Sequence, residues 1–273
     1  MVLSADRNLL FPFSSFRIIP YQEFSGAFNM AFDHFLAVNI LPTDTPILRF
    51  YGWHPYCISL GYHQKDKSLD LAAIKKAGYE AVRRPTGGSA IFHSEELTYS
   101  FIVPKTGLSQ QQIYHTIHLY IADALQQIGY EVSLNEREPN ENYLKKGRAT
   151  FACFNRSAHS EIQFAGRKIL GSAQKIYQKS VLQHGSLLIG PKQAEITRFL
   201  KGNRKSKDEL SVYLKEHSAS LHDIKKMNIQ PIDLSEEIIA KFYSNANAGG
   251  YYLYPTIREI EEAKRFENIF IIT

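Results

Sequence analysis

The sequence predicts an α/β fold of the α+β type, in which helices flank a mixed, largely antiparallel central sheet. The chain has 273 residues and 44% of them are apolar, which is enough for one sizeable core or for one core with a small appendage. Short β-like runs and amphipathic helical runs intermix along the chain without strict strand–helix alternation. There is no internal repeat and no low-complexity tract.

Charge and cysteine content indicate which partners and which cellular compartment suit the protein. The 32 basic and 27 acidic residues give a net charge of +5, which suits acidic partners modestly and is equally typical of solvated surface. The two cysteines are too few for a disulfide framework and suit a reducing compartment. No stretch approaches the roughly 20 apolar residues that span a bilayer, and the N-terminus lacks signal-peptide features. We expect a cytoplasmic protein with no membrane and no nucleic-acid partner, since a basic-aromatic platform is missing.

Periodicity predicts the elements of the first half of the chain. Residues 27–39 place their apolar side chains on one helical face, and Ser25 is a suitable N-cap. The clearest amphipathic helix is predicted at 111–128, where Gly129 closes it. The remaining predicted elements are a short helix at 70–77 and strands at 47–51, 56–61, 81–84, 89–92 and 97–103.

The second half combines strands with a helical end. Ala165-Gly166 predicts a hairpin turn between two β-like runs. A capping box of Thr256 and Glu259 marks the start of the last helix. Further expectations are a loop at 135–146, strands at 160–164, 167–172, 181–189 and 269–272, a basic linker at 201–207, and helices at 208–215, 234–245 and 257–266. We therefore expect a domain over 15–200 and a mainly helical extension over 201–273 packed on the same domain.

A glycine-rich segment follows the predicted strand at 81–84. It runs Arg83-Arg84-Pro85-Thr86-Gly87-Gly88-Ser89, and His93 and Tyr99 follow further along the chain. Adjacent glycines let the backbone approach a ligand closely, their amides can form an anion nest, and either arginine can neutralise a phosphate or carboxylate. The segment matches neither the phosphate-loop nor the dinucleotide pattern. The simpler alternative is a turn with surface arginines.

Two later segments carry polar groups in apolar surroundings. Lys168 lies inside an apolar strand and is followed by the small residues Gly171, Ser172 and Ala173. An amine held there is expected to face a cleft, where it can polarise an acyl carbonyl, contact a phosphate or steer an incoming amine. An exposed strand lysine is the alternative. His184-Gly185-Ser186 forms a polar cluster at a strand start, which either binds ligand or is an ordinary strand entry.

Cys153 is the candidate nucleophile. A thiolate exchanges an acyl group with a thioester at little thermodynamic cost, because one thioester replaces another. The alternative is a buried small hydrophobe, which is the interpretation we give to Cys57. No base adjoins Cys153 in sequence, although His159, His184 or Lys168 can approach it in space. The histidine spacings match no metal-binding motif, so we predict no metal site.

The order of these motifs resembles the biotin/lipoate protein ligase and octanoyltransferase superfamily. The similarity covers roughly residues 15–200. The motifs in order are Phe28–Asp33, Ser59–Gln64, Arg83–Gly88, Gly166–Gln174 and His184–Leu188. The resemblance implies a lipoate-ligase/biotin-synthetase-like catalytic domain that binds the acyl chain in a tunnel. It implies that Arg84 to Ser89 line the acyl site, that Lys168 is the catalytic lysine, and that His184 to Ser186 border the cleft.

The closest branch is the cysteine-dependent octanoyl-[acyl-carrier-protein]:protein N-octanoyltransferase of Gram-positive type, because Cys153-Phe154-Asn155 precedes Gly166-Arg167-Lys168. This branch implies that an octanoyl or lipoyl group passes from a thioester donor such as octanoyl-acyl carrier protein, through Cys153, to a lipoyl-domain lysine. The implied acceptors are glycine cleavage H protein or a dehydrogenase E2, and no cofactor is required. Ser89 replaces an expected arginine or glycine.

Three alternatives stay open. An ATP-dependent lipoate-protein ligase would form an acyl-adenylate, would need ATP and Mg, and would need no cysteine. A lipoyl-domain amidotransferase would use the cysteine with a different donor. A non-catalytic module would hold an acylated protein without turnover.

Overall fold

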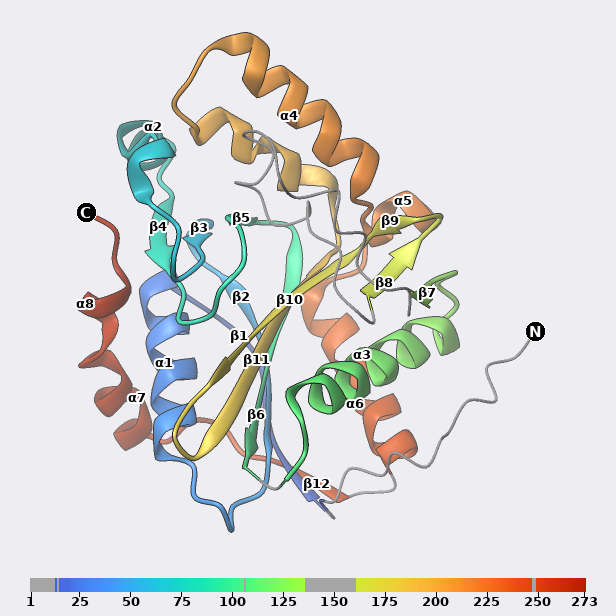
Figure 1. Cartoon of the computed structure of the whole chain (residues 1–273). Helices are drawn as coiled ribbons and strands as arrows, with labels where there is room; N and C mark the ends of the chain where they lie inside the picture. Colours follow the sequence, from blue (N-terminus) through green and yellow to red (C-terminus); the bar gives the residue numbers. More distant parts are fainter. Residues whose placement is uncertain (1–12, 14, 106, 136–160, 247–248) are drawn as a thin grey trace.

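The computed structural model describes residues 13, 15–105, 107–135, 161–246 and 249–273. Its centre is a six-stranded sheet with the strand order β10-β11-β6-β2-β1-β12 (Figure 1). The strands are β1 (Ser15–Phe24), β2 (Ile47–Trp53), β6 (Glu96–Pro104), β10 (Leu170–Ile176), β11 (Ser180–Leu188) and β12 (Gly249–Tyr252). Two smaller sheets have the orders β4-β3-β5 and β7-β8-β9. Their strands are β3 (Cys57–Leu60), β4 (Glu80–Arg83), β5 (Ile91–His93), β7 (Ser133–Asn135), β8 (Glu161–Phe164) and β9 (Arg167–Lys168).

The central sheet is mixed and largely antiparallel, as predicted. β6 is antiparallel to both β2 and β11, and β11 is antiparallel to β10. Within the described part of this sheet, the parallel pairs are those of β1 with β2 and with β12. The register places Gly185 of β11 opposite both Tyr99 of β6 and Ser172 of β10, so these three residues lie in one row across the sheet.

Helices cover both faces of this sheet (Figure 1). Helix α1 (Gly26–Asn39), with α7 (Ile257–Lys264) and α8 (Glu267–Phe270) packed on it, covers one face. Helices α3 (Gln110–Gln127) and α6 (Pro231–Ala246) cover the other. Successive strand residues alternate between the two cores. Phe101 belongs to the α3–α6 core and Ile102 to the α1 core.

The remaining helices lie at the end of the molecule that carries β3, β4 and β5 (Figure 1). They are η1 (Asp66–Ser68), α2 (Leu71–Lys76), η5 (Pro191–Phe199), α4 (Arg204–His217) and α5 (Leu221–Lys225). No described helix combines the length and the apolarity that crossing a bilayer requires.

Several local predictions are confirmed. The Ser25 hydroxyl accepts a hydrogen bond from the Phe28 amide at 3.2 Å and caps α1. Thr256 and Glu259 form the predicted capping box. The turn at Ala165-Gly166 joins β8 to β9 as a hairpin, with positive φ angles of 47° and 75°.

Two predicted elements are wrong. Residues 201–207 are only partly a linker, because helix α4 begins at Arg204, where Asn203 caps it by accepting from the Ser206 amide at 2.9 Å. Residues 269–272 form no terminal strand, since α8 extends to Phe270 and Ile271 makes a single bridge to Val82. The predicted loop at 135–146 lies outside the described residues except for its first position, Asn135, which ends β7.

Candidate functional site

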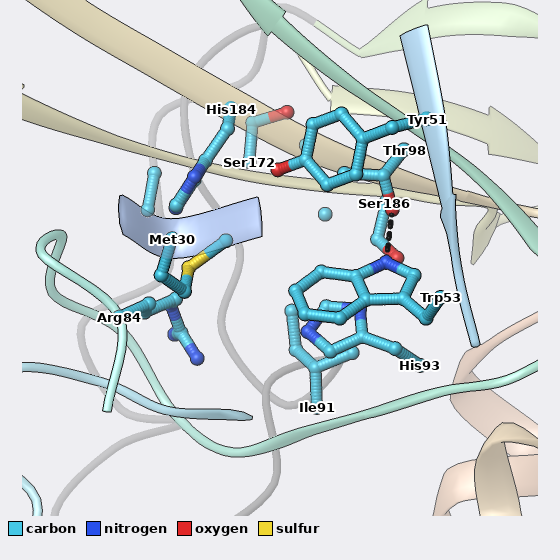
Figure 2. A pocket seen from close by; sticks show the side chains of 13 residues that line it. Met30, Tyr51, Trp53, Arg84, Ile91, His93, Thr98, Ser172, His184 and Ser186 are labelled. Carbon is cyan, nitrogen blue, oxygen red and sulfur yellow. Dashed lines mark hydrogen bonds between the residues drawn. The ribbon is translucent and has the colours of Figure 1, made fainter. Parts of the chain in front are cut away.

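A pocket opens above the central sheet, beside the glycine-rich segment (Figure 2). Its empty space, counted together with the open solvent at its mouth, is about 330 Å³. Eight of its lining residues were predicted from the sequence: Arg84, His93, Gly171, Ser172, Ala173, His184, Gly185 and Ser186. The sequence analysis missed the other five, which are Met30, Tyr51, Trp53, Ile91 and Thr98.

Small residues on two paired strands form the floor of the pocket. Ser172 of β10 pairs with Gly185 of β11, and a Cβ atom at Gly185 would lie 2.2 Å from the Ser172 hydroxyl oxygen and 2.5 Å from the Tyr99 ring. The Tyr99 hydroxyl is 2.9 Å from that of Ser172 and accepts from the Gln183 amide at 2.8 Å. Burial raises the pKa of Tyr99, so its hydroxyl stays protonated and supports the floor of the pocket.

One wall of the pocket is a fixed aromatic stack. The Trp53 indole lies parallel to the His93 ring, with centroids 3.8 Å apart, and donates its N–H to Thr98 at 2.8 Å (Figure 2). His93 is held at both ring nitrogens, by the Glu96 carboxylate at 2.7 Å and by the Ser59 hydroxyl at 2.7 Å. Because all of these groups are buried, the wall is rigid on the side that faces the pocket.

A buried polar network supports the pocket from helix α1. The Asp33 carboxylate accepts from the Arg49 guanidinium at 2.7 Å, from the Tyr51 hydroxyl at 2.9 Å and from the Ser100 hydroxyl at 2.8 Å. Burial alone would raise the pKa of Asp33, but the Arg49 charge and the bonds from His184 and Ser100 outweigh it and hold this pKa below its usual range. Asp33 is therefore ionised, and its charge is compensated.

His184 connects this network to the glycine-rich segment. Its Nδ1 lies 3.5 Å from the Asp33 carboxylate, and its Nε2 lies 2.6 Å from the Thr86 hydroxyl. Burial lowers the pKa of His184, against the effect of Asp33, so the imidazole is neutral near pH 7. The ring thus presents an uncharged surface to the pocket.

The glycine-rich segment is held by its own arginine. Arg84 donates to the Gly87 carbonyl through Nη2 at 2.7 Å and to the Ser89 carbonyl at 2.7 Å. Its Nη1 reaches the Ser59 hydroxyl at 3.1 Å. Gly88 has a φ of 89°, the left-handed conformation that favours glycine. The described contacts of Arg84 therefore shape the segment, and its predicted role as an anion ligand stays a prediction.

Arg83 stabilises the outer side of the same segment. Its guanidinium donates to the carbonyls of Gly61 and Gln64. The Tyr62 amide donates to the Thr86 carbonyl at 2.8 Å, so residues 61–64 pack directly on the glycine-rich segment. Of the predicted site residues, Arg83 thus acts on the loop and not on the pocket lining.

Lys168 is buried, and its amine forms an ion pair with the Glu161 carboxylate across the β8–β9 hairpin. It is not one of the residues that line the pocket. Cys153 lies outside the described residues. The predicted approach of Cys153 and Lys168 to one another therefore stays a prediction, as do their catalytic roles. Cys57 is fully buried in the α1 core region, as predicted.

A pH dependence of stability follows from His184. The unfolded chain protonates its histidines below about pH 6.5, whereas burial lowers the pKa of folded His184. The unfolded state therefore binds more protons as the pH falls, and the free energy of unfolding decreases by up to about 1.4 kcal/mol per pH unit for each such histidine. Burial, and to a smaller extent the Lys175 charge, lowers the pKa of His34, which therefore contributes in the same direction.

Urea unfolding at about pH 7.5 and about pH 5.5 measures this effect. His184→Gln should show a smaller decrease between the two pH values than the parent, with the His34 contribution remaining. An identical decrease in both proteins would show that His184 protonates as readily in the folded chain as in the unfolded one.

Comparison with known proteins agrees with this architecture. The family model described as "Lipoyl protein ligase A/B catalytic domain" matches residues 25–243. Octanoyltransferase LipM of Anoxybacillus flavithermus is 32% identical over 243 residues, which cover 85% of this chain and 86% of that protein. Octanoyltransferase LipM of Staphylococcus aureus is 30% identical over 228 residues, with coverages of 81% and 83%.

Solved structures share the fold. A bipartite lipoate protein ligase from Thermoplasma acidophilum superposes with a TM-score of 0.75, covering 93% of this chain and 92% of that one at 20% identity. Lipoate-protein ligase A bound with ATP gives a TM-score of 0.73 at 20% identity, with coverages of 93% and 94%. These likenesses confirm the predicted lipoate-ligase-like fold. Because the family model covers most of the chain, the protein belongs to the lipoyl protein ligase A/B catalytic domain family.

Proposed function

We propose that this protein is an octanoyltransferase, which moves an octanoyl group from a carrier-protein thioester to a lysine of a lipoyl domain. The observation that carries this proposal is the likeness to octanoyltransferases across more than four fifths of both chains. The carrier-protein donor and the lipoyl-domain acceptor are part of the proposal. The transfer needs no cofactor, since the donor thioester already activates the acyl group.

The lining of the pocket suits a hydrocarbon chain. Met30, Trp53 and Ile91 supply apolar surface to the pocket (Figure 2). Burying an alkyl chain against such surface is favourable, at about 0.8 kcal/mol for each buried methylene group. His184 is neutral and the Asp33 carboxylate is paired with Arg49, so neither residue adds net charge to the pocket. We infer that the acyl chain occupies this pocket.

The proposed chemistry has two steps. The Cys153 thiolate attacks the octanoyl carbonyl, the tetrahedral oxyanion collapses, and the carrier thiolate leaves and takes up a proton. The lipoyl-domain amine then attacks the acyl-Cys153 thioester, loses a proton, and expels the Cys153 thiolate. We assign oxyanion stabilisation to Lys168 and to backbone amides of residues 86–89. The Glu161 ion pair would orient the Lys168 amine for that task.

Labelling of the nucleophile tests the proposal. Incubation with octanoyl-acyl carrier protein should add one octanoyl group to Cys153, detected by mass spectrometry of the protein and its peptides. Cys153→Ser should abolish the adduct and slow transfer to a lipoyl domain by at least about a thousandfold. Cys57→Ala is the matched control and should keep the adduct, because burial raises the pKa of the Cys57 thiol and leaves it unreactive.

A ligase would behave differently in the same assay. It would release pyrophosphate when given free lipoate and ATP, and Cys153→Ser would have no effect. Transfer at the parent rate by Cys153→Ser would overturn the covalent mechanism. The two solved ligase structures do not favour a ligase activity for this chain, because at 20% identity they support the fold alone.

A further inference from the structure

Six exposed lysines belong to the segment 65–76, which includes α2, and to the segment 201–205, where α4 starts. Figure 1 shows α2 and α4 at the same end of the molecule. We call them the basic face: Lys65, Lys67, Lys75, Lys76, Lys201 and Lys205. None of the six forms an ion pair with any residue in the described part of the chain. Their charges are therefore available to an external partner. Residues 65–76 and 201–209, which include all six, hold eight basic and four acidic side chains, a local net charge of +4.

Backbone contacts hold the parts of the basic face together. The Lys201 amide donates to the Ser68 carbonyl at 2.8 Å, and Leu69 and Leu200 form an antiparallel bridge. These contacts join η1, which carries Lys67, to the segment that leads into α4. The face is thus a rigid part of the fold, although its lysines come from three separate stretches of sequence.

The basic face adjoins the glycine-rich segment without entering the pocket. Lys65 directly follows Gln64, whose carbonyl accepts from Arg83, and Tyr62 bonds to Thr86. Residues 61–64 therefore separate the lysines from the pocket. A partner that docks on the basic face must reach the pocket across this segment.

We infer that the basic face is the docking surface for the donor, an acidic acyl carrier protein, and this inference rests on the proposed function. An acidic surface complements six unpaired lysines, and such complementarity raises the rate of encounter. The six lysines are absent from the pocket lining, and this favours the donor over the acceptor. A carrier protein presents its acyl group on a prosthetic arm several times longer than a lysine side chain. A lipoyl domain presents only a lysine and must bring its body to the mouth of the pocket.

Steady-state kinetics with two donors test this surface. Lys67→Glu/Lys201→Glu should raise KM for octanoyl-acyl carrier protein about tenfold at low ionic strength, because like charges then face each other. The same variant should leave KM for octanoyl-pantetheine unchanged, since that donor has no protein body. Added salt should raise the parent KM for the carrier protein and should affect the variant less.

The matched control is Lys179→Glu/Lys264→Glu. It makes the same charge change at exposed lysines in the β10–β11 turn and on α7, and it should leave both KM values unchanged. An equal effect of the two double variants, or a rise in KM for the lipoyl domain instead of the donor, would overturn the assignment.

Fluorescence anisotropy of dye-labelled octanoyl-acyl carrier protein separates this inference from the proposed function. Binding that the Lys67/Lys201 variant weakens supports the docking surface even if no transfer occurs. If neither the double variant nor added salt changes the binding affinity, the docking surface is overturned even if transfer occurs.

Discussion

Gly61→Ala is expected to slow octanoyl transfer by about a hundredfold and to lower the free energy of unfolding by about 1–3 kcal/mol. A Cβ atom at this position would lie 2.0 Å from the Gly88 carbonyl oxygen and 2.9 Å from its carbonyl carbon. Both are backbone atoms, so no side-chain rotation relieves the clash. The glycine-rich segment must shift, and the pocket wall that Arg84 and Thr86 hold shifts with it. Initial rates and urea unfolding measure the two effects.

Gly87→Ala is the matched control for stability. A Cβ atom at Gly87 meets no atom within 4 Å, and this residue does not have a positive φ. Its free energy of unfolding should stay within about 0.5 kcal/mol of the parent. If Gly61→Ala were as stable and as active as the parent, residues 61–64 would not determine the position of the glycine-rich segment.

Asp33→Ala is expected to lower the free energy of unfolding by about 3–5 kcal/mol, because it leaves the buried Arg49 guanidinium without its counter-charge. Arg49 is 1% exposed, and it also donates to the Asn29 side-chain oxygen at 2.5 Å and to the Asn29 backbone carbonyl at 3.4 Å. The Tyr51 and Ser100 hydroxyls would lose their acceptor as well. Urea unfolding at neutral pH gives the measurement.

A double-mutant cycle isolates the ion pair. Arg49→Met removes the cation and keeps much of the buried volume, and it should also destabilise strongly because Asp33 is then uncompensated. The double variant Asp33→Ala/Arg49→Met should lose less than the sum of the two single losses, by at least about 1 kcal/mol. Simple additivity would mean that the pair is not coupled in the folded protein.

Most of the elements that periodicity predicted are present, and the reason for missing β12 can be identified. α1 and α3 have strong apolar periods and good caps, and both formed where expected. β12 begins with Gly249-Gly250 and is exposed throughout, so only its pairing with β1 makes it a strand. Residues 201–207 lack an apolar stripe, but Leu210 and Leu214 further along bury α4 and fix its first turn as well.

The site was predictable in its motifs and not in its supporting network. Eight pocket residues were found because they belong to short, ordered motifs. Asp33 and Arg49 were missed as site residues because the contact joins a helix to a strand. A signal existed: Asn29 and Asp33, four residues apart, are polar groups on one face of a helix that is otherwise mostly apolar. Buried polar residues in such a position require partners, and this requirement is a general clue to a hidden network.

The pairing of β1 with β12 affects the way in which the protein is made. Ser15 and Gly249 are register partners. A strand near the beginning of the chain therefore cannot complete its pairing until a strand near the end has been made. During synthesis on a ribosome, β1 can pair with β2 early, while its second edge remains open until most of the polypeptide has emerged. An open strand edge is a template for wrong pairing, and closing so long a loop is slow. The nascent chain must therefore avoid wrong pairing at this edge of β1 until β12 has been made.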